Sequence, residues 1–388
     1  MANANMIGPE WLLERLRLSP DGRLPWVEVM DQALYAPGVG YYRRGVRRIG
    51  RSGDFYTSVS VGGLYGELLA VFSKGIWVEM ECPTEFLVVE QGAHDGQLMR
   101  DFLEGARRED AEFFEVLRVV LVEPDGELRR AQQENIGDLA GDRVRWVEDW
   151  SEIRGQGLIF CNELLDAFAV HWLKRVGKGW RELWVEEEEK FGGGLVFVEG
   201  ELSTQALAME AALLEGDFAE GQLIEVNVAM VQWLREVSGS GFEGVMLVAD
   251  YGLPERELLA AERMEGTLRR YMGHRSDGRV LEDLGECDLT SHVNFTRLAS
   301  EGLALGWRVV EFVEQGRFLT RVASAKMGEP GFVASASWVR QFQMLTHPHH
   351  LGQSFHVLAL AKGALGAEVC ASLDSDAALR RLGLGDQM

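Results

Sequence analysis

Acidic and amide side chains end four apolar segments of this chain, and they are the first candidates for chemistry. They are Glu90 in FLVVE (86–90), Glu123 in RVVLVE (118–123), Asn162 and Glu163 in GLIFCNE (157–163), and Asp250 in VMLVADYG (245–252). Ligands of parallel sheets bind outside the carboxyl ends of the strands, so these side chains are expected to gather at one site. Carboxylates there would bind hydroxyl or cationic groups through charge-assisted hydrogen bonds.

A glycine turn follows the first of these segments. Gly92 and Gly96 flank a short stretch that contains His94 and Asp95, and the helix-like QLMRDFLEG comes next. A strand, a tight turn and a helix start bind nucleotides in the first crossover of many sheets, but they also occur as plain structure. The turn matches neither the dinucleotide nor the P-loop pattern. An acid inside it suits a ligand with positive charge better than a phosphate, although Asp95 could equally cap the helix.

Two further acidic positions have distinct expected roles. Glu123 ends the second strand, where an acid typically holds ribose hydroxyls, and the alternative is an acid that faces water. In CNELLDAF (161–168), Glu163 and Asp166 share one face if a helical turn follows. Two acids on one wall suit a guanidinium or an ammonium group, and the alternative is N-capping of that turn.

A third group of polar residues lies in poorly periodic sequence near the C-terminal third. GTLRRYMGHRSD (266–277) and DLTSHVNF (288–295) contain His274, Asp288, Thr290, His292 and Asn294. Their spacing matches no standard metal motif, so we expect no metal site. We expect instead a substrate lid or wall at 264–300, and the alternative for each histidine is a structural hydrogen-bond donor.

The alternation of elements indicates an α/β fold. Apolar strands alternate with helical patterns at 97–110, 126–137, 205–215 and 225–237, which predicts a parallel sheet covered on both faces. Residues 170–200 alternate polar and apolar around glycine turns, which predicts a β-hairpin insertion. Short helices are expected within 9–34, and two more strands near the C-terminus.

Composition excludes several function classes. The chain has 388 residues, 46% of them hydrophobic, which allows one large domain with additions or two domains. The net charge of −22 argues against non-specific binding of nucleic acid, although a basic run begins at Arg43. The four scattered cysteines favour a reducing compartment. We expect no secretory signal and no transmembrane helix.

Several blocks in order resemble the MidA family of S-adenosylmethionine-dependent methyltransferases, whose eukaryotic members are mitochondrial complex I assembly factors that methylate arginine. The blocks span about Asp31 to Gly363 and are ALYAPGVGYY, GRSGDFYTS, VVEQGAHDG, LVEPDGELR, CNELLDAFAV, ADYG, GTLRRYMGH, DLTSHVNF and LGQSFHVLALAKG. The family often has small residues where this chain has GAHDG, so His94 and Asp95 make the turn bulkier.

The resemblance implies a fold, a cofactor and a set of site residues. The fold would be a Rossmann-like class I methyltransferase sheet (76–363) with an N-terminal helical segment and cofactor-covering loop (1–75), a β-hairpin insertion and a tail (364–388). The cofactor would be S-adenosyl-L-methionine. Its contacts would come from Thr57 and Ser58 in the covering segment 54–58, from Glu90, from Gly92 and Gly96 at the methionine end, from Glu123 at the ribose, from Asp149 and Trp150 at the adenine, and from Asn162 beside the methyl group.

The expected reaction is methyl transfer to an arginine side chain of a protein, such as a respiratory-chain subunit. Glu163 would bind the guanidinium with support from Asp166, and His292 is a second candidate for accepting the proton. The alternatives are an assembly factor that has lost transfer, which the bulky turn suggests, and a small-molecule methyltransferase. We expect a cytoplasmic protein, or one of the mitochondrial matrix if the source is eukaryotic. The sequence does not indicate the oligomeric state.

Overall fold

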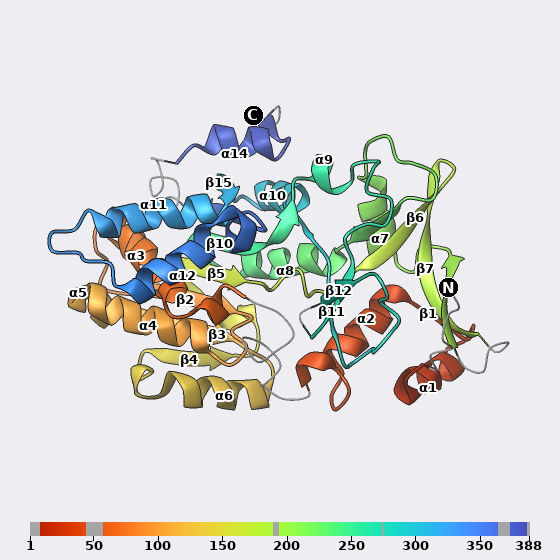
Figure 1. The fold of residues 1–388 in the computed structure, drawn as a ribbon, viewed down its shortest axis with the longest axis horizontal. Helices are drawn as coiled ribbons and strands as arrows, with labels where there is room; N and C mark the ends of the chain where they lie inside the picture. Colours follow the sequence, from red (N-terminus) through yellow and green to blue (C-terminus); the bar gives the residue numbers. More distant parts are fainter. Residues whose placement is uncertain (1–7, 44–56, 189–193, 274, 364–372, 386–388) are drawn as a thin grey trace.

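A doubly wound sheet forms the centre of the computed structural model, which describes residues 8–43, 57–188, 194–273, 275–363 and 373–385 (Figure 1). Its strands run in the order β15-β16-β10-β5-β2-β3-β4. Their bounds are β2 (Phe86–Gln91), β3 (Leu117–Val122), β4 (Val144–Val147), β5 (Arg154–Asn162), β10 (Gly241–Leu253), β15 (Arg308–Glu314) and β16 (Phe355–Lys362), and β14 (Val293–Asn294) pairs with β10.

Strand direction places a switch point next to the predicted site. Five adjacent strands run parallel to one another: β4, β3, β2, β5 and β10. The next strand, β16, runs antiparallel to both β10 and β15. The chain builds outward from β2 through β3 and β4, and then returns to β5 on the other side of β2. Ligands bind at such a reversal, so the crevice between the ends of β2 and β5 is the expected site.

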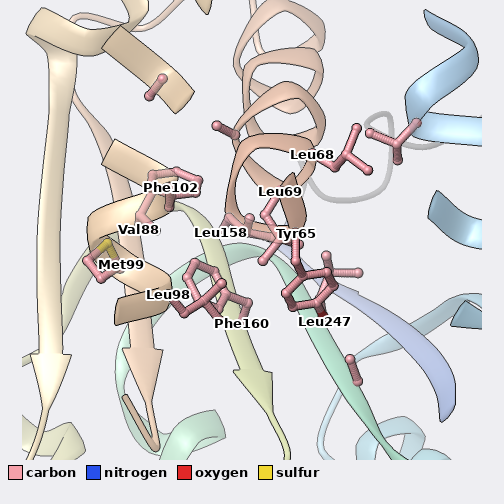
Figure 2. Close-up of a cluster of buried hydrophobic side chains, with 14 of the residues drawn as sticks. Tyr65, Leu68, Leu69, Val88, Leu98, Met99, Phe102, Leu158, Phe160 and Leu247 are labelled. Carbon is pink, nitrogen blue, oxygen red and sulfur yellow. The ribbon is translucent and has the colours of Figure 1, made fainter. Parts of the chain in front are cut away.

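Helices cover both faces of the sheet. One face carries α3 (Leu64–Glu79), α4 (Gln97–Glu109), α5 (Ala111–Val116), α11 (Gln315–Met327) and α12 (Ala336–Thr346), and the other carries α8 (Val228–Gly239), α10 (Phe295–Ala304) and α14 (Ser375–Arg381). Figure 2 shows the first face, where side chains of α3 and α4 pack on the strands, with the rings of Phe102 and Phe160 5.8 Å apart. Burying one such ring contributes about 1.5–3 kcal/mol, so this apolar layer fixes the strand ends.

The predicted hairpin insertion is part of a larger, second sheet. Strands β6 (His171–Val176), β7 (Gly179–Glu188) and β8 (Gly194–Gly200) are joined by β9 (Leu223–Val226) and by β1 (Arg23–Pro25), in the order β1-β7-β6-β9 with β8 on β7. Leu24 pairs with Val185, so the N-terminal segment adds a strand that its sequence did not indicate. The predicted helix 225–237 begins instead at Val228, where Asn227 caps it by accepting a bond from the backbone N–H of Met230.

Some of the remaining elements lie beside the central sheet, as α6 (Gly126–Ile136) does next to α4, and others lie beside the second sheet, as α1 (Glu10–Leu18) and α2 (Trp26–Tyr35) do (Figure 1). These elements are the helices α1, α2, α6, α7 (Gln205–Ala212) and α9 (Glu255–Leu258), the short helices η1 (Tyr41–Arg43), η3 (Val59–Val61), η4 (Gly137–Leu139), η5 (Trp150–Glu152) and η7 (Pro348–Gly352), and a small sheet of β11 (Arg269–Met272), β12 (Arg275–Asp277) and β13 (Asp288–Thr290). This small sheet lies in the segment expected as a substrate lid.

Two expected boundaries differ from the observed elements. The boundary after residue 75 falls inside α3, which packs against α4 on the central sheet. The described part of the expected tail forms α14, where Ser375 donates its hydroxyl to the Val309 carbonyl at 2.5 Å. The helices α3 and α14 therefore both pack against the central sheet. No helix among the described ranges is long and apolar enough to cross a membrane.

Candidate functional site

A cavity of about 500 Å³ lies at the carboxyl ends of β2, β3 and β5. This volume is within the range of pockets that enclose drug-sized ligands. The lining comes from the ends of the three strands, from the glycine turn, from the N-terminal segment and from the start of α8. It includes Asp31, Tyr35, Tyr42, Arg43, Thr57, Glu90, Gln91, Gly92, His94, Asp95, Glu123, Asp125, Asn162, Glu163, Leu164, Phe168 and Ala229. The cavity therefore occupies the switch point of the central sheet.

The glycine turn needs its glycines for two reasons. Gly92 and Gly96 have φ of 83° and 82°, which is the left-handed region that side chains avoid. A Cβ on Gly92 would lie 3.1 Å from the Leu164 side chain, and one on Gly96 would lie 3.1 Å from the Gln132 backbone. The bulky centre is accommodated because Asp95 accepts a bond from the Gln97 N–H at 3.1 Å. Asp95 lies one residue before Gly96, which is the N-cap of α4, and it also lines the cavity.

Glu123 is held in place by bonds to both of its oxygens. Oε1 accepts from the Asp125 N–H at 2.9 Å, and Oε2 accepts from Gln132 Nε2 at 3.1 Å. Gln132 also donates to the His94 carbonyl at 3.0 Å, which ties the glycine turn to the end of β3. Burial raises the pKa of Glu123 to about 7. Each carboxylate oxygen can accept two hydrogen bonds, so Glu123 keeps capacity for ligand hydroxyls.

Glu90 lies on the cavity wall with one oxygen unpaired. Its side chain is 2% exposed, and Oε2 has no hydrogen-bond partner among the described residues. Burial, with the nearby charge of Asp95, raises the pKa of Glu90 to about 8. A buried polar atom without a partner is costly and uncommon, so a donor from a ligand would stabilise this carboxyl group.

Glu163 shows the same pattern beside a strained backbone. Its φ is 52°, an uncommon value for a side chain of this size. Oε1 accepts from the Ser58 N–H at 3.1 Å and from Asn162 Nδ2 at 2.9 Å, whereas Oε2 is buried without a partner in the described part of the chain. Burial raises the pKa of Glu163 to about 8.

Asp250 explains how the strained turn is held. Its Oδ2 accepts from the backbone N–H groups of Leu164 at 3.2 Å and Leu165 at 2.8 Å. Its Oδ1 accepts from the Tyr251 N–H at 2.8 Å, and its side chain is fully buried. Asp250 thus clamps the chain that follows Glu163 to β10, and it fixes the direction of the Glu163 side chain.

The structure brings half of the predicted site residues to the cavity wall. Thr57, Glu90, Gly92, Glu123, Asn162 and Glu163 line it. Ser58 acts behind the wall through its bond to Glu163, and Gly96 shapes the turn without lining the cavity. Of the segment 54–58 expected to cover the cofactor, residues 54–56 lie outside the described residues.

The two residues predicted to contact adenine, Asp149 and Trp150, bond to other parts of the chain. Asp149 is exposed, and its side chain accepts from the Ser151 N–H at 2.7 Å, so it caps η5 instead of entering the cavity. Trp150 is 3% exposed and donates its indole N–H to Gln91 Oε1 at 2.8 Å. Neither residue lines the cavity. The sequence placed both residues after the third strand, but it did not show that Asp149 bonds to a neighbouring backbone N–H and Trp150 to a glutamine side chain.

Asp166 and His292 also lie away from the cavity wall. Asp166 is 5% exposed, and burial beside Asp250 and Glu163 raises its pKa well above the usual range. Burial lowers the pKa of His292 to about 4, so its ring stays neutral near pH 7. Neither His292 nor Asp166 is among the residues that line the cavity, so the roles expected for them stay predictions.

Residues of the N-terminal segment were missed by sequence reasoning. Tyr35 and Tyr42 stack with ring centroids 5.5 Å apart, and Tyr42 donates to Asp288 Oδ1 at 2.9 Å. Arg43 forms an ion pair with Asp125 and donates from Nε to the Tyr35 carbonyl at 3.2 Å. The aromatic residues of ALYAPGVGYY were the available signal, since an ordered aromatic loop needs a surface to cover.

The charge of the wall limits the ligand. Among the described residues, the carboxyl groups that line the cavity are those of Asp31, Glu90, Asp95, Glu123, Asp125 and Glu163. The described side chains that can carry positive charge there are Arg43 and His94. Such a wall favours a ligand with positive charge over a polyphosphate. Within the described ranges, no group of three His, Cys, Asp or Glu side chains has the geometry to hold a metal ion.

Comparison with known proteins identifies the family. Residues 68–313, more than half of the chain, match the family described as "Putative S-adenosyl-L-methionine-dependent methyltransferase". The chain is 27% identical to the protein arginine methyltransferase NDUFAF7, mitochondrial, of Mus musculus, over 92% of this chain and 86% of the relative. It is also 27% identical to the Drosophila melanogaster homolog, over 92% of this chain and 85% of the relative.

Two solved structures from Burkholderia thailandensis share the fold. One is a "likely methyl transferase" bound to S-adenosyl-homocysteine, with a TM-score of 0.80 and 28% identity over 95% of this chain and 93% of that one. The other is a native crystal structure of an uncharacterized protein, with a TM-score of 0.77 and 29% identity over 94% of each chain.

The residues of the cavity fit the cofactor that this family uses. The cofactor has an amino group, a positively charged sulfur and ribose hydroxyls. The wall offers an oxygen of Glu90 that has no partner among the described residues, and a positioned acid in Glu123. A side chain on Gly92 would crowd Leu164 on the cavity wall, so glycine keeps the turn close to the site. The chain thus belongs to the MidA family of S-adenosyl-L-methionine-dependent methyltransferases, with S-adenosyl-L-methionine as its cofactor.

Proposed function

We propose that the chain methylates the guanidinium group of an arginine in a protein substrate. The observation that carries the proposal is Glu163, whose Oε2 is buried, unpartnered among the described residues and on the cavity wall beside Asn162. The names of the mouse and fly relatives, which are protein arginine methyltransferases, support the same acceptor.

The chemistry of the wall favours arginine as the acceptor. A guanidinium is a planar cation with several N–H donors, and it pairs with carboxylates in a fixed geometry. Burial keeps Glu90 and Glu163 partly protonated near neutral pH, because the pKa of each is about 8. A cation that enters the cavity stabilises the ionised carboxylates and displaces those protons. A neutral acceptor would not displace these protons, and it would gain no charge-assisted hydrogen bond from the acids.

The cofactor and the acceptor would contact different residues of the cavity wall. When bound, the cofactor supplies a methyl group on a positively charged sulfur. The glycine turn, Glu90, Glu123, Thr57 and Asn162 would hold it. Glu163 would orient the guanidinium, with Asp250 fixing the turn and the buried Asp166 supporting it from behind the wall. Most of the acceleration would come from this positioning of two reactants.

Glu163 would also take up the proton that the guanidinium loses. A guanidinium nitrogen that gains a methyl group must release a proton, so that the methylated guanidinium keeps a single positive charge. Oε2 has no other partner among the described residues, so it can accept that proton. A carboxyl group with a pKa of about 8 can hold a proton at neutral pH and release it to solvent afterwards.

Glu163→Gln tests this assignment. The substituted side chain keeps its size and can still accept from Ser58 and Asn162, but it carries no charge and takes up no proton. We expect methyl transfer to a protein substrate to fall by about 10²–10⁴-fold, and calorimetry to show S-adenosyl-homocysteine bound within about threefold of the unaltered affinity. Glu236→Gln on the exposed side of α8 is the control. Unchanged transfer with intact binding would contradict the role of Glu163.

The same assay separates the other hypotheses. A scaffold without activity predicts no transfer to any acceptor even when the cofactor binds. A small-molecule methyltransferase predicts that the labelled product passes through a filter that retains proteins. The respiratory-chain subunit as substrate, and the cytoplasm or mitochondrial matrix as compartment, stay predictions; the relatives named above are mitochondrial proteins.

A further inference from the structure

Gln91 is the last residue of β2, and its side chain has an unusual pair of partners. Its Oε1 accepts the indole N–H of Trp150 at 2.8 Å and that of Trp233 at 2.8 Å. The two indoles meet edge to face with centroids 6.5 Å apart, and both are almost fully buried. One comes from η5 and the other from α8, so two separate elements converge on a single amide oxygen.

This pairing determines which way the amide points. An indole N–H is only a donor, so the atom that meets both indoles must be the oxygen of Gln91. Rotating the amide by half a turn would set its NH₂ group against two donors. The NH₂ group is therefore directed away from the tryptophans, and it has no hydrogen-bond partner among the described residues. Gln91 lines the cavity, so its NH₂ group is available to a ligand.

We propose that Gln91 is a positioning residue that donates to the adenine of the cofactor. Adenine has ring nitrogens that accept hydrogen bonds and flat faces that pack on apolar groups. Leu164, Phe168 and Ala229 supply apolar wall to the same cavity, and Phe168 packs edge to face against Trp233 at 6.5 Å. The cationic methionine end suits the acid Glu90 instead. The tryptophans act on the cofactor only through Gln91, which gives Trp150 a role other than direct contact.

Binding measurements with two probes test the proposal without any acceptor. S-adenosyl-homocysteine contains the adenine and the amino acid, whereas 5′-methylthioadenosine keeps the adenine and lacks the amino acid. Gln91→Leu keeps the size of the side chain and removes both the donor and the oxygen that the two indoles share. We expect it to weaken both probes by the same factor, about three- to tenfold, the effect of one lost hydrogen bond. Weakening of S-adenosyl-homocysteine alone would place the amide at the methionine end and overturn the proposal, as would unchanged binding of both.

A second set of variants tests the role of the tryptophans. Trp150→Phe with Trp233→Phe keeps two aromatic rings and frees the amide to rotate. We expect both probes to bind about two- to fivefold more weakly, because the ligand must now order the side chain. Trp307→Phe is the matched control, since the indole N–H of Trp307 is bonded at 2.7 Å to Ser238 in the same core and away from Gln91. Equal losses in the control and in the paired variant would overturn the orienting role.

Discussion

Glu163→Gln should stabilise the cofactor-free protein, and only at high pH. Burial raises the pKa of Glu163 from 4.5 to about 8 in the folded protein. The unfolded chain leaves this pKa near 4.5, so between these pH values the folded state holds a proton that the unfolded state has released. Stability therefore falls as pH rises from about 4.5 through about 8, and the loss is complete above the folded pKa.

The size of the effect follows from the same two values. At about 1.36 kcal/mol for each pKa unit, the rise corresponds to roughly 4–5 kcal/mol as an upper limit. Relaxation of the site around the ionised group lowers this, and we expect about 2–4 kcal/mol. The amide introduced by Glu163→Gln would not titrate, and it retains the acceptor for Ser58 and Asn162. The variant should match the unaltered protein near about pH 5 and exceed its stability near about pH 9.

Urea unfolding followed by tryptophan fluorescence measures this difference at the two pH values. Glu90 and Asp250 also have pKa values raised by burial, so both proteins will lose stability with pH. Comparing the variant with the unaltered protein isolates Glu163, and Glu236→Gln controls for charge on the surface. An equal difference at the lower and the higher pH, or a variant less stable at the higher pH, would refute the reasoning.

Two further changes test the cofactor end of the cavity. Gly92→Ala should weaken the binding of S-adenosyl-homocysteine about tenfold or more, measured by calorimetry. The reason is that φ is 83° and the added Cβ would lie 3.1 Å from Leu164. Unchanged affinity would mean that the turn does not shape the site. Arg43→Gln should weaken the same probe by about two- to fivefold, because the ion pair with Asp125 that holds the N-terminal segment at the cavity is partly exposed. Asp125→Asn keeps an acceptor for the N-terminus of α6 and removes the charge, so it should cause a loss of similar size, and unchanged affinity would argue against the pairing.

The sequence predicted the central sheet well because its signals were local. Apolar runs such as FLVVE, RVVLVE and GLIFCNE become β2, β3 and β5, since strands buried on both faces need continuous apolar residues. The second sheet was harder to predict. The pairing of Leu24 with Val185 joins residues far apart in the chain, and nothing in a three-residue strand reveals its partner.

The residues of the site also differ in how far the sequence could predict them. Glu90, Glu123 and Glu163 could be named from sequence because the end of a parallel strand is a defined position in the fold. Gln91 and Arg43 could not, because their roles depend on the partners Trp233 and Asp125, which come from other elements. Asp149 and His292 have residue types that suit catalysis or binding, but capping and burial account for them.

The central claim is transfer of a methyl group to the guanidinium of a protein arginine. The most direct test is to incubate the purified chain with S-adenosyl-L-methionine carrying a labelled methyl group and a protein extract of the source organism. The labelled proteins are then hydrolysed to amino acids and identified by mass spectrometry. We predict label in methylated arginine, and its loss with Glu163→Gln. Label confined to another amino acid or to small molecules would contradict the claim.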